Sequence, residues 1–119
     1  MAAQKVAAVT GASRGIGSCI AAELAARGYL VACLSRKGLG PEDRARSAEE
    51  TANSADFACD VGDDAALKAA FKAVHDRFGR IDLLVNNAGQ HDEGKSADYT
   101  TDAFEKLLRV NTTAVFAAC

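Results

Sequence analysis

A glycine-rich segment at residues 10–17, TGASRGIG, most constrains what this chain can fold into. The apolar run before it, residues 6–9, predicts a strand, and residues 15–27 predict a helix. Glycines let a backbone approach a phosphate without a Cβ in the way, and the N–H groups and positive dipole end of the helix then face the phosphate charge. The segment therefore predicts a strand, turn and helix that hold the diphosphate of a dinucleotide.

Strand-like and helix-like stretches alternate along the whole chain. Four apolar runs predict strands, and three longer stretches with helical spacing predict helices, the second starting at Asp63 or Asp64 and ending at Gly79. The strands are expected at residues 6–9, 30–34, 57–59 and 81–85, and the helices at 15–27, 63–78 and 101–119. Right-handed crossovers would set the strands in the order 3-2-1-4. We therefore expect an α/β fold with a Rossmann-like doubly wound parallel sheet.

Two helices in this scheme carry specific expectations. In the first, Ile16, Ile20 and Leu24 share one face, and nearby alanines would allow close packing on the sheet. Residues 38–54 predict a poorly buried helix, because their apolar side chains after Pro41 are all alanines. Residues 86–100 are expected to form a polar loop.

The length of 119 residues suits one domain, so residues 1–119 are expected to form a single dinucleotide-binding domain. The last predicted helix reaches Cys119 without a glycine, an asparagine or a cationic last turn to end it. We therefore expect a sheet that is truncated after the fourth strand and its following helix, and a domain that is incomplete at the C-terminus. The fourth strand would then form an exposed apolar edge.

Composition excludes several classes of function. A net charge of −2 with scattered Lys and Arg argues against nucleic acid as a partner. No apolar run approaches the ~20 residues that span a bilayer, and the N-terminus lacks the apolar core of a signal peptide, so we expect no membrane partner and a cytoplasmic location. The four cysteines, Cys19, Cys33, Cys59 and Cys119, form no C-x-x-C pair and lie far in sequence from His75 and His91, so no metal site is expected. Cys33 and Cys59 fall in strand-like runs and are expected to be buried.

Three further motifs follow the predicted strands or lie in the last helix. Asn86-Asn87-Ala88-Gly89 comes directly after the fourth strand, Asp60-Val61 after the third, and Asn111 lies in the last helix. Together with the G-x-x-x-G-x-G spacing, they make the chain resemble the short-chain dehydrogenase/reductase family, most closely its 3-oxoacyl-carrier-protein reductase and carbonyl reductase members. The resemblance covers the whole chain, as the N-terminal half of such a protein.

The resemblance implies a cofactor site drawn from all four strand ends. Gly11 would make the tight turn, and Gly15, Ile16 and Gly17 would lie along the diphosphate. Asp60 would meet the adenine amino group beside the Val61 backbone, although an aspartate there is also a common way to start a turn. Asn86 and Asn87 have a similar alternative, in which they only satisfy backbone groups. The full set of expected cofactor-binding residues is Gly11, Ser13, Arg14, Gly15, Ile16, Gly17, Ser35, Arg36, Asp60, Val61, Asn87, Ala88 and Gly89.

The residues after the second strand bear on the choice of cofactor. An NAD site usually places a carboxylate there for the ribose 2′-hydroxyl, whereas this chain has Ser35-Arg36-Lys37. A guanidinium suits a 2′-phosphate, and Arg14 adds a second positive charge from the glycine turn. The sequence thus favours NADP(H) over NAD(H); the alternative is that Arg36 and Lys37 are solvated loop charges.

The catalytic residues of the family are only partly matched. The family uses a tyrosine, a lysine four positions later, a serine that positions the carbonyl, and an asparagine that holds a water. Asn111 matches the asparagine, although it is also a polar residue able to bend a buried helix. Tyr29 is followed four residues later by Cys33, Tyr99 is followed by Ala103, and Ser54 and Ser96 lie in the wrong elements. We expect the chain to be inactive by itself.

The resemblance therefore implies the cofactor-binding half of an NADP(H)-dependent oxidoreductase that reduces carbonyls or oxidises alcohols. Its complete form would act on a small carbonyl or alcohol substrate and form a homo-oligomer, with Phe104, Leu108 and Phe116 at an interface or in the core. Two alternatives remain open: a nucleotide-binding or interaction module without catalysis that docks on an intact relative, and a plain βα domain without a ligand.

Overall fold

A computed structural model of the chain describes residues 4–89 and 97–119. His91, Ser96 and part of the loop expected at residues 86–100 lie outside the described residues. In the described part, no helix is both long enough and apolar enough to cross a membrane.

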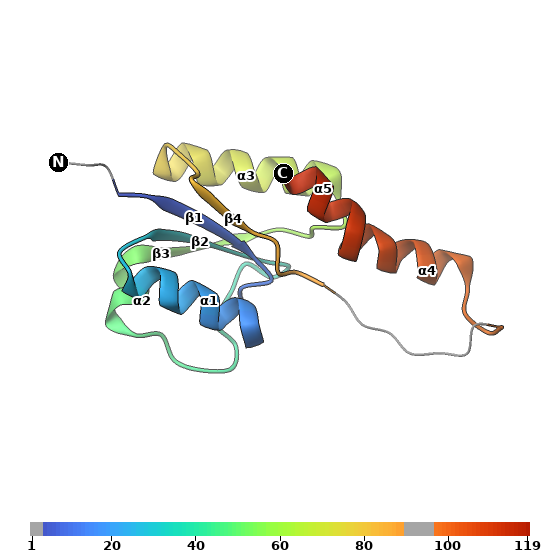
Figure 1. The fold of residues 1–119 in the computed structure, drawn as a ribbon, viewed down its shortest axis with the longest axis horizontal. Helices are drawn as coiled ribbons and strands as arrows, with labels where there is room; N and C mark the ends of the chain where they lie inside the picture. Colours follow the sequence, from blue (N-terminus) through green and yellow to red (C-terminus); the bar gives the residue numbers. More distant parts are fainter. Residues whose placement is uncertain (1–3, 90–96) are drawn as a thin grey trace.

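Four parallel strands form one sheet, and their order β3-β2-β1-β4 confirms the predicted order (Figure 1). The strands are β1 (Val6–Thr10), β2 (Leu30–Ser35), β3 (Ser54–Ala58) and β4 (Leu83–Val85). Strand β1 pairs with β2 from Val6 opposite Leu30 to Thr10 opposite Leu34, and with β4 from Ala7 opposite Leu83 to Val9 opposite Val85. The chain is thus an α/β protein with a Rossmann-like sheet, and β4 forms one of its edges.

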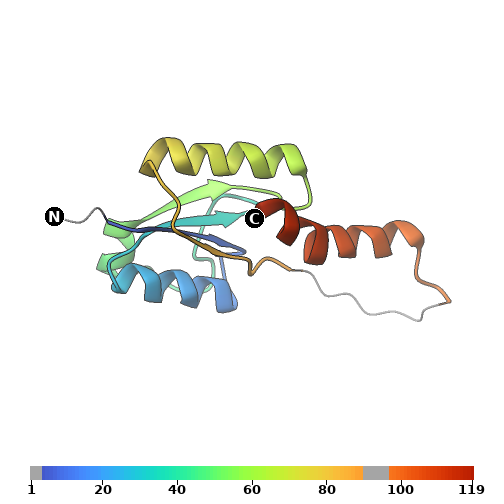
Figure 2. The ribbon, with the colours of Figure 1, turned by 45° about the horizontal axis from the view of Figure 1, so that its top comes forward.

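Helices cover both faces of this sheet (Figure 2). On one face lie α1 (Gly15–Ala26) and α2 (Ala48–Asn53), and on the other lies α3 (Asp64–Phe78), which the C-terminal α5 (Ala114–Ala118) contacts. Strand β1 is entirely buried between them, because its side chains alternate between the two faces. Val6 and Ala8 pack in the cluster that includes Leu67 and Val74 of α3, whereas Val9 packs in the cluster with Ala21 and Ala25 of α1.

The packing of α1 differs from the expectation in one respect. Its buried residues are small, namely Gly17, Ser18, Ala21 and Ala25, whereas the Ile16 side chain is 74% exposed. Ile20 and Leu24 are partly buried against the cluster as expected. Small side chains bring the α1 backbone close to the sheet, and the face of the helix that packs on the sheet does not include Ile16.

The helix expected at residues 38–54 was wrong over most of its length. Only Ala48–Asn53 is helical, starting at a capping box in which Ser47 and Glu50 exchange hydrogen bonds. Residues 38–46 form an irregular segment, which we call the strap. Strand β3 then begins at Ser54 rather than at residue 57, and Cys59 follows its end.

Helix α3 follows its expectation closely. The Asp63 carboxylate accepts hydrogen bonds from the N–H groups of Ala65 and Ala66, and Gly79 ends the helix in the left-handed conformation at φ +81°. Strand β4 begins later than residue 81, because the Asp82 carboxylate accepts the Val6 N–H at 2.8 Å in place of a strand carbonyl.

The C-terminal helix extends away from the sheet and is interrupted. Helix α4 (Thr101–Leu108) continues into a π-helical turn, Arg109–Thr113, and then into α5. Apolar side chains exposed along these elements are Phe104, Leu108, Val115 and Phe116. The expected helix at 101–119 is therefore present but carries a π turn at Asn111, and the described chain leaves much of its apolar surface uncovered.

Candidate functional site

A cavity of about 370 Å³ opens where the carboxyl ends of the four strands meet. This is the place where ligands bind open parallel sheets, between strands whose connections leave in opposite directions. The cavity is lined by Gly11, Ser13, Arg14, Ser35, Arg36, Lys37, Glu42, Cys59, Asp60, Val61, Asn87, Ala88, Gly89 and Val110. The structure thus brings most of the expected cofactor residues together; Gly15, Ile16 and Gly17 lie just behind the lining, at the start of α1.

Thr10 joins the ends of β1 and β4 next to this cavity. Its side-chain oxygen accepts hydrogen bonds from the N–H groups of Asn87 and Ala88, both at 3.0 Å, and donates to the Val85 carbonyl at 3.4 Å. The Asn87 amide donates to the Gly11 carbonyl at 3.1 Å. The glycine turn after β1 and the segment after β4 are therefore held as one unit, which gives the asparagine a clear structural role.

Two glycines are required by close backbone approach in this unit. A Cβ on Gly17 would lie 2.1 Å from the Gly11 carbonyl oxygen, and a Cβ on Gly11 would lie 2.9 Å from the Ala88 Cα. Gly11 also has φ +64°, which L side chains rarely adopt. The first and last glycines of the motif therefore shape the turn, whereas a Cβ on Gly15 would meet no atom within 4 Å.

The first turn of α1 carries no cap of its own. Its N-cap residue, Arg14, makes no capping side-chain hydrogen bond, and no acidic residue lies in the first turn. The Gly15 N–H instead donates to the Asp43 carboxylate of the strap at 2.9 Å. An anion from a distant part of the sequence thus sits on the turn predicted to hold phosphate.

Positively charged side chains line the cavity after the ends of β1 and β2. Arg14, Arg36 and Lys37 line it, and none of them forms an ion pair within residues 4–89 and 97–119. The Ser35 hydroxyl is occupied in shaping the adjoining turn, since it accepts the Gly38 N–H at 3.1 Å and donates to the Leu39 carbonyl at 3.3 Å. Three cations without a counter-ion among the described residues suit an anionic group of a ligand.

Asp60 both starts a turn and lines the cavity. One of its carboxylate oxygens accepts the Gly62 N–H at 3.0 Å, and the residue is exposed. Val61 is half-buried beside it. Asp60 therefore does start a turn, as the alternative interpretation predicted. Its second carboxylate oxygen makes no bond to a described residue.

Asn111 lies in the π-helical turn, next to the cavity but outside its lining. Its side-chain oxygen reaches Gly89, where a Cβ would approach it to 3.2 Å. A π turn widens a helix locally and is frequent at functional sites. The helix is thus irregular at Asn111, and the π turn brings this residue to the segment after β4.

The two buried cysteines are confirmed as buried, and neither is poised to react. Burial raises the pKa of the Cys33 thiol to about 11, and the nearby Asp56 charge adds to the shift. Burial likewise raises the pKa of Cys59, with a further contribution from Asp60. In the described part of the chain, no group of three or more His, Cys, Asp or Glu side chains could hold a metal ion.

Five residues of this region were not expected at the site from the sequence: Thr10, Glu42, Asp43, Cys59 and Val110. Thr10 could have been identified from the sequence, because it places a hydroxyl at the end of an apolar strand, just before a glycine. Glu42 and Asp43 had no signal, because they lie in an irregular strap whose path depends on contacts distant in sequence.

Comparison with known proteins agrees with this geometry. Residues 5–119 match the family described as short chain dehydrogenase, and the chain belongs to that family. Among curated relatives, D-threitol dehydrogenase of Mycolicibacterium smegmatis is 37% identical over 116 residues, which cover 97% of this chain and 45% of that protein. The chain thus spans about half the length of the curated relatives it matches.

Solved structures show the same similarity. A metagenomic short-chain oxidoreductase in complex with NADP superposes with a TM-score of 0.86 at 34% identity, covering 98% of this chain and 53% of that one. The 3-ketoacyl-(acyl-carrier-protein) reductase of Brucella melitensis, complexed with NADH, gives 0.84 at 28% identity, covering 98% and 48%. Relatives of this fold therefore include one solved with each nicotinamide cofactor.

Proposed function

We propose that this chain is the cofactor-binding half of an NADP(H)-dependent oxidoreductase that reduces a small carbonyl compound or oxidises the matching alcohol. The observation that carries the choice of cofactor is that three cations lining the cavity, Arg14, Arg36 and Lys37, have no counter-ion within residues 4–89 and 97–119. A carboxylate at the end of β2 would repel a 2′-phosphate, whereas guanidinium groups pair with it.

Each wall of the cavity would hold a different part of the dinucleotide. Gly15, Ile16 and Gly17 would offer backbone N–H groups to the diphosphate, and Ser13 and Gly11 would shape the turn beneath it. Asp60 and Val61 would contact the adenine, Asn87, Ala88 and Gly89 the adenosine ribose, and Ser35, Arg36 and Arg14 its 2′-phosphate. The nicotinamide supplies or accepts the hydride.

Proton transfer needs groups that these 119 residues do not contain. Neither tyrosine of the chain begins a Tyr-x-x-x-Lys sequence, so the chain lacks the tyrosine and lysine pair that would donate and relay the proton. Asn111 would serve as the positioning residue that holds a water for such a lysine. By itself the chain would bind cofactor without turnover.

The remaining properties of the complete protein follow from the same proposal. Residues 1–119 would form a single dinucleotide-binding domain of a cytoplasmic enzyme with a small carbonyl or alcohol substrate. The exposed apolar side chains of α4 and α5, among them Phe104, Leu108 and Phe116, would be covered in a homo-oligomeric dimer or tetramer.

Titration of the folded chain with NADPH and with NADH tests the proposal. NADPH is expected to bind more tightly, and Arg36→Asp should weaken it about 30-fold, on the order of 2 kcal/mol for a lost charged hydrogen bond, while NADH affinity holds or rises. Lys68→Asp, on the exposed surface of α3, makes the same charge change away from the cavity and should leave both affinities unchanged. An unchanged preference in Arg36→Asp would contradict the choice of NADP(H). Failure of a folded chain to bind either cofactor would favour an interaction module instead.

A further inference from the structure

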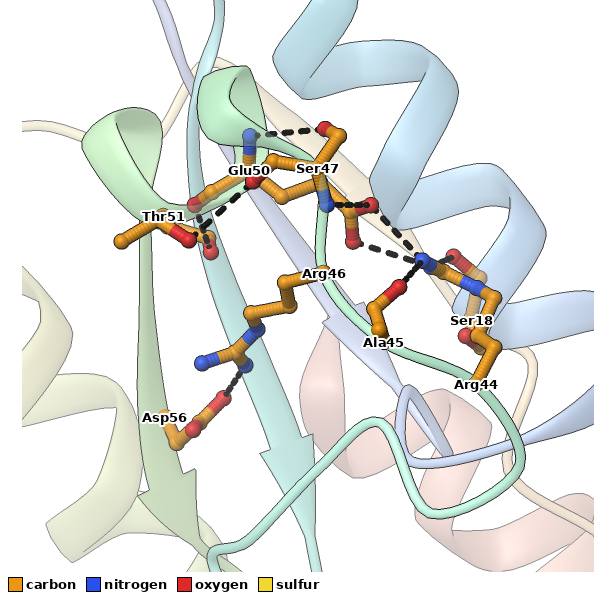
Figure 3. A network of polar contacts seen from close by, with 9 residues as sticks. Ser18, Arg44, Ala45, Arg46, Ser47, Glu50, Thr51 and Asp56 are labelled. Carbon is orange, nitrogen blue, oxygen red and sulfur yellow. Dashed lines mark hydrogen bonds and ion pairs between the residues drawn. The ribbon is translucent and has the colours of Figure 1, made fainter.

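The strap, residues 38–46, is held firmly at its α2 end (Figure 3). The Arg44 guanidinium donates to both oxygens of Glu50, at 2.7 and 2.9 Å, and to the Ser18 carbonyl of α1 at 2.9 Å. Arg46 forms an ion pair with Asp56 of β3. Glu50 is only 5% exposed and Arg44 is half-buried, so this anchor is a bidentate, partly buried ion pair.

The middle of the strap lies directly on the glycine turn. The Glu42 N–H donates to the Ser13 carbonyl at 2.6 Å, and a Cβ on Gly40 would lie 3.0 Å from the Ser13 Cα. Asp43 follows at once, and its carboxylate accepts the Gly15 N–H at 2.9 Å. The anchored strap therefore places one carboxylate, 28 residues away in sequence, on the first turn of α1.

That first turn attracts a single kind of ligand. Its free N–H groups and the positive end of the helix dipole favour an anion, and α1 contributes none from its own first turn. The diphosphate of a dinucleotide would use the same N–H groups. The Gly15 N–H has one hydrogen to donate, so the Asp43 carboxylate and a diphosphate exclude each other there.

We propose that Asp43 is an internal anion that occupies the diphosphate position on α1, so that a dinucleotide binds by displacing it. This inference rests on the proposed cofactor site and adds a determinant of affinity to it. Displacing Asp43 costs the same free energy whichever cofactor enters, since the diphosphate is common to NADPH and NADH. The strap should therefore lower both affinities by one factor and leave their ratio unchanged.

The test is to titrate the chain and its Asp43→Asn and Asp43→Ala variants with NADPH, NADH and inorganic pyrophosphate. Both variants should bind all three about fivefold more tightly, the order expected for loss of one carboxylate at a helix N-terminus, with an unchanged NADPH-to-NADH ratio. Glu49→Gln removes one negative charge from the exposed face of α2 and should leave the affinities as they are. Circular dichroism confirms that each variant is folded.

The outcomes separate the two proposals. If neither Asp43 variant binds more tightly than the wild type, or if Glu49→Gln tightens binding by the same factor, the role of Asp43 is overturned. The proposed cofactor site would then still stand. A changed cofactor ratio would also overturn it, because Asp43 would then act near the 2′-position. If the folded wild type and both variants bind none of the three ligands, both proposals are wrong.

Discussion

The two walls of the cavity are built in different ways. One wall, which we call the backbone wall, comprises residues 10–17 and 87–89, where the Thr10 and Asn87 side chains bond to main-chain groups and the glycines let two main-chain segments approach closely. The other, which we call the charged wall, comprises residues 35–37 and 42–43, where the side chains of Arg36, Lys37 and Glu42 are exposed. In the proposed cofactor site, the backbone wall would decide whether a dinucleotide fits, and the charged wall would decide which dinucleotide is preferred and how tightly it is held.

The largest expected effect comes from breaking the backbone wall at Gly17. Gly17→Ala should destabilise the chain by about 3 kcal/mol, because the new Cβ overlaps the Gly11 carbonyl and neither backbone can retreat. Chemical denaturation followed by circular dichroism measures this.

Gly15→Ala is the matched control, since its Cβ meets no atom within 4 Å and only its φ of +58° is unfavourable. We expect it to cost about 1 kcal/mol. Equal losses in the two variants would mean that close approach does not shape this wall.

A smaller effect should follow from removing the Thr10 hydroxyl. Thr10→Val keeps the shape but leaves the N–H groups of Asn87 and Ala88 without their acceptor, at a cost of about 2 kcal/mol. Dinucleotide affinity should fall as well, because the segment after β4 loses its tie to the glycine turn. Thr10→Ser retains the hydroxyl and should keep the affinity; a Ser variant as weak as the Val variant would assign the effect to the lost methyl group instead.

The smallest expected effect concerns the anchor of the charged wall. Hydrogen bonding to Arg44 lowers the pKa of Glu50, so the charged carboxylate stabilises the folded chain. That stabilisation is complete above the unfolded-state pKa of about 4.3 and is lost as the pH falls below it towards the lower pKa of the folded chain. Glu50→Gln should cost about 1 kcal/mol at neutral pH and flatten the acid side of the stability profile.

Denaturation midpoints across the acid range check this, with Glu49→Gln as the exposed neighbour that should leave the profile unchanged. An acid limb that is as steep in Glu50→Gln as in the wild type would place the titrating group elsewhere.

Much of the architecture followed from local patterns. The strand order was predicted because alternating elements and right-handed crossovers leave few topologies, and α3 was predicted because Asp63 and Gly79 mark its two ends. Gly11, Arg36, Asp60 and Asn87 were singled out from four separate loops, and the structure brings them to one cavity.

The errors fall where local pattern carried little information. Pro41, Glu42 and Asp43 suit the first turn of a helix, yet residues 38–46 form the strap, in which Arg44 and Arg46 pair with carboxylates on α2 and β3. Ile16 fits the spacing of an apolar face, yet it is exposed because the small residues Gly17, Ala21 and Ala25 bring a different face of α1 against the sheet.

The sequence by itself determined the fold class, the order of the strands and the glycine turn, because periodicity, chain chirality and the lack of a Cβ act over a few residues. Only the tertiary structure decided that the strap lies on that turn and that Asp43 holds the Gly15 N–H. Such contacts join side chains far apart in sequence, and whether they form depends on charges and surfaces that meet only after the sheet has assembled.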